Sequence, residues 1–200
     1  MKNFLKTIGM IFSAIRLIPH LILLATRDKN GLIRADIDRW NDIYMKDKKS
    51  GPALAFIRLM TIYPEYRNLF YHRVGWLGKI VDPLCRPMNT LFISTAVIGP
   101  GLFIQHGFAT IIAAKSIGAN CWINQQVTIG YSNTDDCPTI GDNVTISAGA
   151  KLIGAVTLGN NSKVGANAVV VKNVPANSTI VGVPARIVKR DGKRVNEPLS

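Results

Sequence analysis

The sequence has few cysteines and few histidines, three of each in 200 residues. Cys85, Cys121 and Cys137 are odd in number and show no metal-ligand spacing. We therefore expect a reduced, cytoplasmic protein without a disulfide framework and without a bound metal.

Acidic residues are also scarce, with 12 Asp and Glu against 24 Lys and Arg. The excess is uneven, because residues 1–90 hold 15 basic and 7 acidic residues whereas residues 91–175 hold 4 and 3. Clustered positive charge suits a phosphate-bearing ligand or an anionic membrane surface. No nucleic-acid-binding module accompanies the basic residues, so nucleic acid is not an expected partner.

The N-terminal stretch lacks an apolar run long enough to span a membrane, because Arg16, Pro19 and His20 interrupt it. Polar residues recur there at spacings of three, four or seven: Lys2, Lys6, Ser13, Arg16, His20 and Arg27. Large apolar residues occupy the opposite face: Phe4, Leu5, Ile8, Ile11, Phe12, Ile15, Ile18 and Ile22. The pattern predicts a basic amphipathic helix over residues 1–27, which either packs on its own protein or a partner subunit or lies on the cytoplasmic face of a membrane.

Residues 33–75 keep helical patterns. One helix is expected to close at Gly51, a second covers "ALAFIRLMTIY", and a third runs from Pro64 to Gly75. Two prolines in "DPLCRPMN" then break the regularity. We expect an α-helical N-terminal region over residues 1–90, a second domain over residues 91–188 and a basic C-terminal tail over residues 189–200.

Beyond residue 90, aliphatic residues recur every six positions. The unbroken series is Ile140, Ile146, Leu152, Leu158, Val164 and Val170. The same spacing occurs earlier, in Ile98 and Ile104 and in Ile117, Ile123 and Ile129. Four places after these stand further apolar or small residues: Leu102, Phe108, Cys121, Val127, Val144, Ala150, Val156, Ser162, Ala168 and Val174.

A six-residue step would scatter these residues around a helix, whereas positions i, i+4 and i+6 of an extended chain face one side. The length of the series and its recurrent glycines exclude one straight strand. A coil of short strands and turns, a parallel β-helix, satisfies both conditions. The interval is 13 residues from Ile104 to Ile117 and 11 from Ile129 to Ile140, where "GYSNTDDCPT" predicts a loop outside the coil.

The hexads, with "IGDNVTISAGAKLIGAVTLGNNSKVGANAVVV" and the closing "NSTIVGVPARIV", resemble the hexapeptide-repeat acyltransferases over about residues 92–190. "LFIQHGFATII", "INQQVTIG" and "GVPAR" are similar to the serine acetyltransferase branch, and more closely to the colanic-acid-type polysaccharide acetyltransferases. The resemblance implies a mainly β fold, a left-handed parallel β-helix preceded by an α-helical region, which works as a homotrimer with acetyl-CoA as the acetyl donor.

A lone histidine is more often structural than catalytic, but His106 fills neither core slot of its hexad, which belong to Ile104 and Phe108. The resemblance puts the catalytic histidine at this place. A neutral imidazole accepts the proton that a hydroxyl loses as it attacks a thioester, so His106 is the expected general base. Cys137 has no paired base, so an acyl-enzyme is not expected. The three-histidine carbonic anhydrases of this fold are excluded, because His106 is the only histidine of the repeats.

By resemblance, coenzyme A would lie in a groove between two subunits and contact Gly130, Ala148, Ala166, Val171, Lys172 and Arg186. Small residues let the backbone approach a pantetheine arm, and the basic residues near the C-terminus suit its phosphates. The alternative is that these basic residues belong to a solvated tail.

The match departs from serine acetyltransferases at the acceptor site. Gln105 stands where they carry Asp, and Asp136-Cys137 stands where they carry an Arg-His pair suited to a carboxylate. We assign Gln105, Asp135 and Asp136 to acceptor binding. An anion in place of a cation disfavours serine and favours a sugar hydroxyl.

The sequence therefore predicts an acetyl-CoA-dependent O-acetyltransferase acting on a saccharide, either a cell-surface polysaccharide or its precursor. One alternative is a serine O-acetyltransferase with a divergent acceptor site. Another is a non-catalytic β-helix that serves as an assembly module, against which His106 argues.

Overall fold

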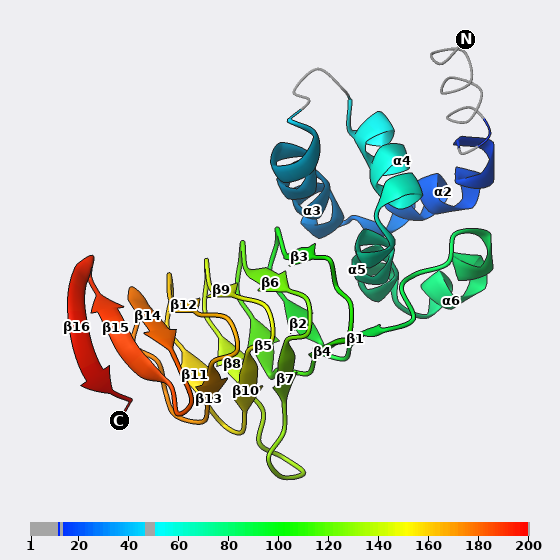
Figure 1. Ribbon diagram of the computed structural model, residues 1–200. Helices are drawn as coiled ribbons and strands as arrows, with labels where there is room; N and C mark the ends of the chain where they lie inside the picture. The colour runs from blue at the N-terminus through cyan, green and yellow to red at the C-terminus, as the bar shows by residue number, and fades with distance from the viewer. Residues whose placement is uncertain (1–11, 13, 47–50, 200) are drawn as a thin grey trace. The chain divides into compact units, whose positions relative to one another are not determined.

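The computed structural model describes residue 12 and residues 14–46 and 51–199. The chain divides into two compact units, Met1–Met88 and Asn89–Ser200. Helices make up the first unit and short strands the second (Figure 1).

The helical unit is built from α2 (Ile18–Arg27), α3 (Leu32–Trp40), α4 (Pro52–Ile62) and α5 (Pro64–Val74), followed by η2 (Gly75–Leu77), α6 (Gly78–Val81) and η3 (Asp82–Leu84). Prolines open α4 and α5, where no helical N–H bond is lost, and Gly75 ends α5 with a φ of 67°. The helix predicted to close at Gly51 is shorter, because α3 ends at Trp40 and a π-helical turn, η1 (Asn41–Met45), follows it. Residues 47–50 lie outside the described residues.

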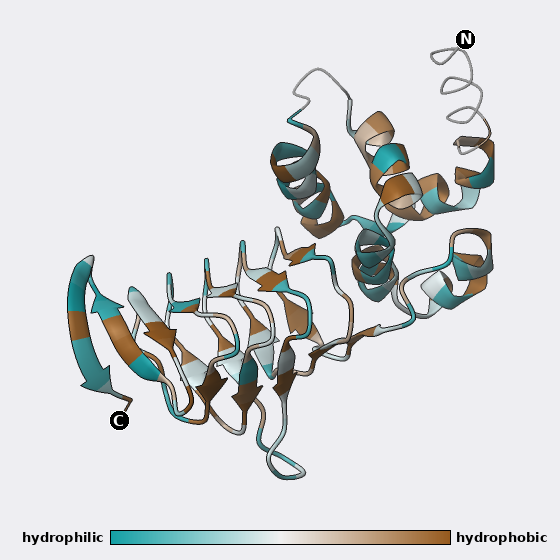
Figure 2. Ribbon diagram, in the orientation of Figure 1, coloured by the Kyte–Doolittle hydropathy of each residue, from teal (hydrophilic) through white to brown (hydrophobic). Residues whose placement is uncertain are grey.

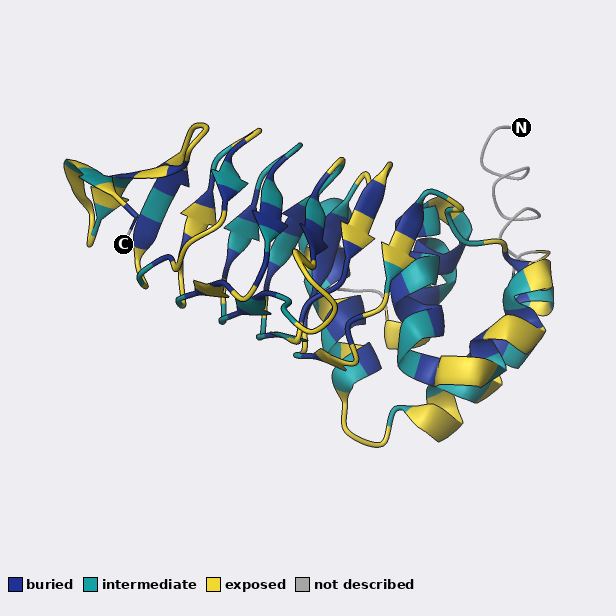
Figure 3. Ribbon diagram, turned by 90° about the horizontal axis from the view of Figure 1, so that it is seen from below, coloured by how far each residue is buried: buried dark blue, intermediate teal, exposed yellow. Residues whose placement is uncertain are grey.

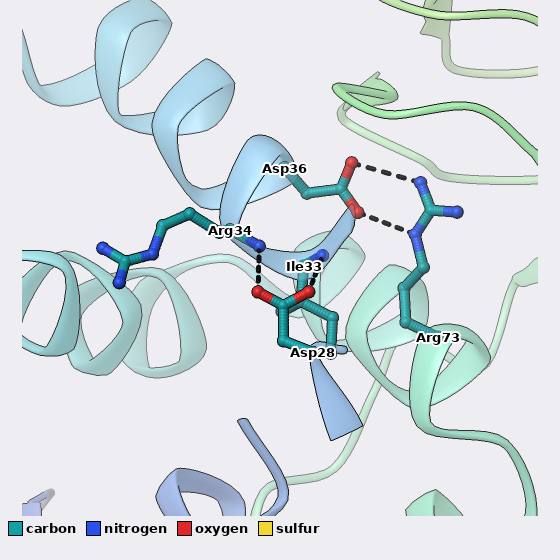
Figure 4. Close-up of polar contacts among 5 residues, drawn as sticks. All are labelled: Asp28, Ile33, Arg34, Asp36 and Arg73. Carbon is teal, nitrogen blue, oxygen red and sulfur yellow. Dashed lines mark hydrogen bonds and ion pairs between the residues drawn. The ribbon is translucent and has the colours of Figure 1, made fainter. Parts of the chain in front are cut away.

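Two carboxylates fix α3 within this unit (Figure 4). Asp28 accepts hydrogen bonds from the backbone N–H groups of Ile33 at 2.8 Å and Arg34 at 3.0 Å, which satisfies two free donors of the first helical turn. Asp36 accepts from Nε of Arg73 at 2.8 Å and from its Nη2 at 3.2 Å, and both side chains are nearly buried. Removing one partner of a buried pair of this kind lowers the folding stability by several kcal/mol. The pair therefore fixes α3 against α5.

The core of the helical unit is aromatic. Trp40, Phe56, Tyr66 and Phe70 are at most 1% exposed, and the rings of Trp40 and Tyr66 meet edge to face at a centroid distance of 5.2 Å. Aromatic pairs of this geometry stabilise a core beyond the area that they bury.

The predicted polar stripe of the N-terminal helical segment is not uniformly exposed, because Arg27 is exposed but Arg16 is half-buried. His20 is fully buried, whereas Phe12, Ile15, Ile18 and Ile22 are exposed. The hypothesis that the apolar stripe packs on its own protein is therefore wrong for the described residues. The remaining positions of both stripes before residue 12, and Ser13, lie outside the described residues.

His20 is held by a chain of hydrogen bonds. The hydroxyl of Tyr71 donates to the carbonyl of Cys85 at 2.6 Å, so Nε2 of His20 donates to the Tyr71 oxygen, at 2.9 Å. Burial, and then the positive charges of Arg16 and Arg67, lower the pKa of His20 to about 4. The buried imidazole is thus neutral at pH 7.

The second unit is a parallel β-helix of three sheets in which each sheet takes every third strand. Sheet A contains β1 (Leu91–Ile93), β4 (Thr110–Ile112), β7 (Thr128–Gly130), β10 (Lys151–Ile153) and β13 (Val169–Val170). Sheet B contains β2 (Val97–Ile98), β5 (Ser116–Ile117), β8 (Thr139–Ile140) and β11 (Thr157–Leu158). Sheet C contains β3 (Phe103–Gln105), β6 (Trp122–Asn124), β9 (Thr145–Ile146), β12 (Lys163–Val164) and β14 (Ser178–Val181).

The repeating aliphatic residues face the axis of the coil. All positions of the six-residue series are at most 5% exposed, and hydrophobic residues recur at matching places of successive strands (Figure 2). The adjacent outward positions are more exposed, so buried and exposed residues alternate along the strands (Figure 3). The predicted class, a left-handed parallel β-helix preceded by a helical region, is confirmed.

One predicted core position is wrong. Phe108 is 54% exposed, and the buried Thr110 takes the place beside Val127. The reason is that Ile112 follows Ile104 after eight positions, whereas Ile129 follows Ile123 after six. The two extra residues form a wider turn that carries Phe108 out of the core, and the shorter interval from Ile112 to Ile117 leaves the net interval of 13.

The predicted C-terminal tail is a β-hairpin. β15 (Arg186–Arg190) and β16 (Lys193–Pro198) pair antiparallel and extend sheet C beyond β14. In the part of the chain that the structure describes, no helix is long and apolar enough to cross a membrane.

Acid should destabilise the helical unit through His20. The unfolded chain, with an imidazole pKa near 6.5, binds more protons than the folded chain between about pH 6.5 and pH 4, so stability is lost as the pH falls through that window. The loss is on the order of 3 kcal/mol for a shift of this size. Urea unfolding of wild type and His20→Gln at pH 7 and pH 5 checks this, because the variant should lose less stability between the two values. Equal losses would contradict it.

Candidate active site

His106 lies where the chain turns from sheet C into sheet A. The same turn recurs in the next coils at Gln125 and Gln126, at Ala148 and Gly149, and at Ala166 and Asn167. Backbone hydrogen bonds join these turns in a column: Gln126 N to Phe108 O at 2.8 Å, Gly149 N to Gln125 O at 3.0 Å, and Asn167 N to Ala148 O at 2.9 Å. We call this column the His106 edge.

His106 has an exposed side chain and a left-handed backbone, with a φ of 64°. Asn120, Asn143, Asn161, Asn167 and Asn177 take this conformation in other turns, and Gln126 and Gly149 take it within the His106 edge. Asparagine tolerates positive φ, whereas other non-glycine residues lose about 1 kcal/mol there. A histidine at this place is therefore not chosen for backbone stability, and the turn points its imidazole out of the coil.

Gln105 precedes His106 on the outer face of sheet C. Its side-chain oxygen accepts a hydrogen bond from the indole N–H of Trp122 at 3.2 Å. The ring of Trp122 also meets the buried ring of Phe103 edge to face, at a centroid distance of 4.6 Å. Trp122 was missed in the sequence, although its position gives a signal, because the matching outward places in later coils hold Thr145, Lys163 and Thr179.

Asp136 organises its own loop. Its carboxylate accepts hydrogen bonds from the N–H groups of Ser132 and Asn133, both at 2.7 Å, and from the Ser132 hydroxyl. These bonds, the Ser132 hydroxyl first, lower the pKa of Asp136 below its usual value. Asp135 is exposed. The loop lies against β10, since a Cβ added to Gly154 would stand 3.2 Å from the Ser132 hydroxyl oxygen.

The predicted acceptor residues of one chain are not brought together. His106 and Gln105 lie where sheet C turns into sheet A, whereas Asp135 and Asp136 lie where sheet A turns into sheet B. Gly130, at the end of β7, adjoins the second turn. Ala148 and Ala166 are on the His106 edge, where their small side chains leave room for a ligand.

The other three predicted donor-site residues line one pocket. Val171, Lys172 and Arg186 line a cavity of about 200 Å³ together with residues of the C-terminal hairpin, among them Leu199. Nζ of Lys172 donates to the carbonyl of Leu199 at 3.2 Å, and Nε of Arg186 donates to Oδ1 of Asn196 at 3.0 Å. The two cations fit a phosphate-bearing ligand, and the hairpin orients them.

Lys151 is a further cation near the His106 edge that the sequence interpretation missed. Its Nζ donates to the carbonyl of Gln126 at 2.6 Å and to the hydroxyl of Thr128 at 3.2 Å. In the sequence it is one Lys among the outward positions of the hexads, and only the fold places it beside this turn.

Cys121 is not suited to act as a nucleophile. Burial raises the pKa of the Cys121 thiol to about 11, so it stays protonated. Cys137 lies in the loop, where it raises the pKa of the exposed Tyr131 hydroxyl. Among the described residues, no group of three or more His, Cys, Asp or Glu side chains is arranged to hold a metal ion.

The chain matches known acetyltransferases in sequence and in structure. The model of the family "Bacterial transferase hexapeptide (six repeats)" matches residues 137–172. A serine acetyltransferase from Staphylococcus xylosus is 46% identical over 171 residues, which cover 78% of this chain and 79% of that protein.

Two kinds of solved complex extend this comparison. Serine acetyltransferase from Brucella abortus in complex with coenzyme A is 28% identical, with a TM-score of 0.67 over 86% of this chain and 72% of that one. Soybean serine acetyltransferase complexed with serine is 28% identical, with a TM-score of 0.64 over 79% of this chain and 68% of that one. The resemblance to polysaccharide acetyltransferases is not supported by these findings.

The identity extends over most of both chains, and the second unit is a parallel β-helix of six-residue repeats. The chain therefore belongs to the serine acetyltransferase family of hexapeptide-repeat transferases and is an acetyl-CoA-dependent acyltransferase.

Proposed function

We propose that the protein transfers the acetyl group of acetyl-CoA to the hydroxyl of L-serine, and that His106 is the general base. The observation that carries the acceptor is the 46% identity with a serine acetyltransferase over most of both chains. It favours the alternative that the sequence left open over the saccharide acceptor.

The reaction needs one base and no covalent enzyme intermediate. As the serine oxygen forms its bond to the thioester carbonyl carbon, His106 accepts the hydroxyl proton. The carbon–sulfur bond then breaks, and His106 returns the proton to the departing thiolate. Exposure of the His106 side chain lets it meet both substrates at the edge of the coil.

Asp136 does not exclude serine. The sequence argument against serine assumed that its carboxylate faces the acceptor. Instead, the carboxylate accepts hydrogen bonds from Ser132 and Asn133 of its own loop. This arrangement engages the charge locally and removes the main objection to an amino acid as acceptor.

The acetyl donor would extend along the His106 edge. Ala148 and Ala166 leave room there for the pantetheine arm, and the pocket of Lys172 and Arg186 supplies positive charge for the phosphates. Coenzyme A supplies the activated acetyl group as a thioester, and the chain supplies the groove and the base.

We infer that the active form is a homotrimer. An exposed apolar patch lies on sheet A and at the adjacent turn: Phe92 is 60%, Phe108 54% and Ile111 44% exposed, and Phe92 pairs with Ile111 in the register of β1 and β4. A patch beside a catalytic residue is expected to be covered by another subunit. A neighbouring copy would also bring its loop of residues 131–137 to the His106 edge.

Removing the base should abolish most turnover. His106→Ala should lower kcat by roughly 10² to 10⁴ while the Kd for coenzyme A changes little, because a general base acts in the chemical step. A thioester-release assay measures kcat, and calorimetric titration measures the Kd for coenzyme A. His72→Ala, in α5, is the matched control and should keep its activity. A His106→Ala enzyme with near-normal kcat would make the histidine structural.

The acceptor is identified by a substrate panel. With acetyl-CoA, L-serine should be used with a kcat/KM of at least about 10⁴ M⁻¹s⁻¹, within the ordinary range for a true substrate. Monosaccharides and nucleotide sugars should be poor acceptors in the same thioester-release assay. Efficient acetylation of a sugar together with poor use of L-serine would restore the saccharide hypothesis.

The trimer depends on the apolar patch. Ile111→Asp places a charge in the buried interface and should yield monomers with little activity. Val97→Asp is the control, because Val97 is 63% exposed on sheet B. Light scattering after gel filtration gives the masses. An Ile111→Asp protein that stays trimeric would show that another surface holds the subunits together.

A further inference from the structure

The outer face of sheet C carries a hydrogen-bonded pair directly before the proposed base. Trp122 on β6 donates its indole N–H to Oε1 of Gln105 on β3. Phe103 on β3 is the register partner of Trp122, and the edge-to-face contact between the two rings holds the indole in place. The tryptophan is thus positioned both by its ring and by its N–H.

The chemistry of the indole decides which way the Gln105 amide points. Trp has a donor and no acceptor, whereas the Gln amide has one oxygen that accepts and one nitrogen that donates twice. The indole N–H therefore requires the amide oxygen on its own side. The amide nitrogen therefore lies on the other side, away from the indole.

A glutamine oriented in this way acts as a donor toward a ligand. Trp122 occupies one lone pair of its oxygen, and its two N–H groups are directed away from the indole, where they can donate to a ligand. Such a group binds a carboxylate well and an ammonium poorly. The loop of residues 131–137 offers no compensating cation, because its charged side chains are Asp135 and Asp136.

We propose that Gln105, oriented by Trp122, donates to the carboxylate of the acceptor L-serine and so selects an amino acid with a free carboxylate. Trp122 is a positioning residue, because it acts through Gln105. The inference rests on the proposed function, since it names how that same site recognises its acceptor. It also explains an aromatic residue at an outward place that holds Thr145 in the next coil.

The test compares two acceptors that differ in the carboxylate. L-Serine and L-serinamide share the hydroxyl and the amino group, but the amide lacks the anionic oxygens. Gln105→Glu replaces the donor by a carboxylate of the same size, which repels L-serine. Its kcat/KM should fall about tenfold or more for L-serine, through KM, and change less than about twofold for L-serinamide. The KM for acetyl-CoA should not change.

Trp122→Phe keeps an aromatic ring against Phe103 and removes only the N–H. It should lower the kcat/KM for L-serine by about three- to tenfold, the usual worth of one hydrogen bond. In a Gln105→Ala background the same substitution should have no further effect, because its action passes through Gln105. Trp76→Phe is the matched control, since Trp76 is 69% exposed in the helical unit. It should leave the kcat/KM for both acceptors unchanged.

The outcomes separate this inference from the proposed function. If wild type acetylates L-serine but Gln105→Glu lowers the kcat/KM for L-serine and for L-serinamide equally, the proposed function stands and the proposed role of Gln105 is wrong. If Trp122→Phe has the same effect with and without Gln105, Trp122 is merely structural. If wild type acetylates a sugar and not L-serine, the proposed function fails and the carboxylate recognition fails with it.

Discussion

The β-helix depends on the stacking of aliphatic side chains at every sixth residue along one axis. Each coil buries its residues against those of the coils above and below, and parallel ladders such as Ile123 with Ile146 hold the register. Inserting or deleting one residue within a hexad would move the next aliphatic side chain out of the core. The regular coils therefore restrict variation to the turns and to the outward positions, and the proposed catalytic residues lie there.

The turn at His106 shows how function enters such a repeat. Two extra residues widen it and expel Phe108 from the core, and His106 takes a left-handed conformation that also occurs in the regular turns at Gln126 and Asn167. The cost is confined to one turn, because Thr110 and Ile112 restore the register in β4. The column of turns below His106 stays regular, so small residues such as Ala148 and Ala166 continue the same edge.

Much of this could be predicted from the spacing of Ile140 to Val170, because a core that repeats every six residues has few structural solutions. Phe108 was predicted wrongly because its residue type fits the repeat and only the width of the turn decides its place. Asp136 was misjudged because its partners, Ser132 and Asn133, are chosen by loop conformation. His20 looked like part of a polar face, but a hydrogen bond to Tyr71, distant in sequence, buries it. Such long-range pairings leave no periodic signal.

Direct transfer at the His106 edge is the central claim, and a single-turnover experiment tests it most directly. Enzyme in excess is mixed with acetyl-CoA labelled in the acetyl group and with L-serine, then quenched within one turnover and separated into protein and small molecules. The label should pass from acetyl-CoA to O-acetylserine without a stage bound to protein. Label that appears on the protein before it appears in the product, for example at Cys137, would contradict the account. O-acetylserine that carries no label would also contradict it.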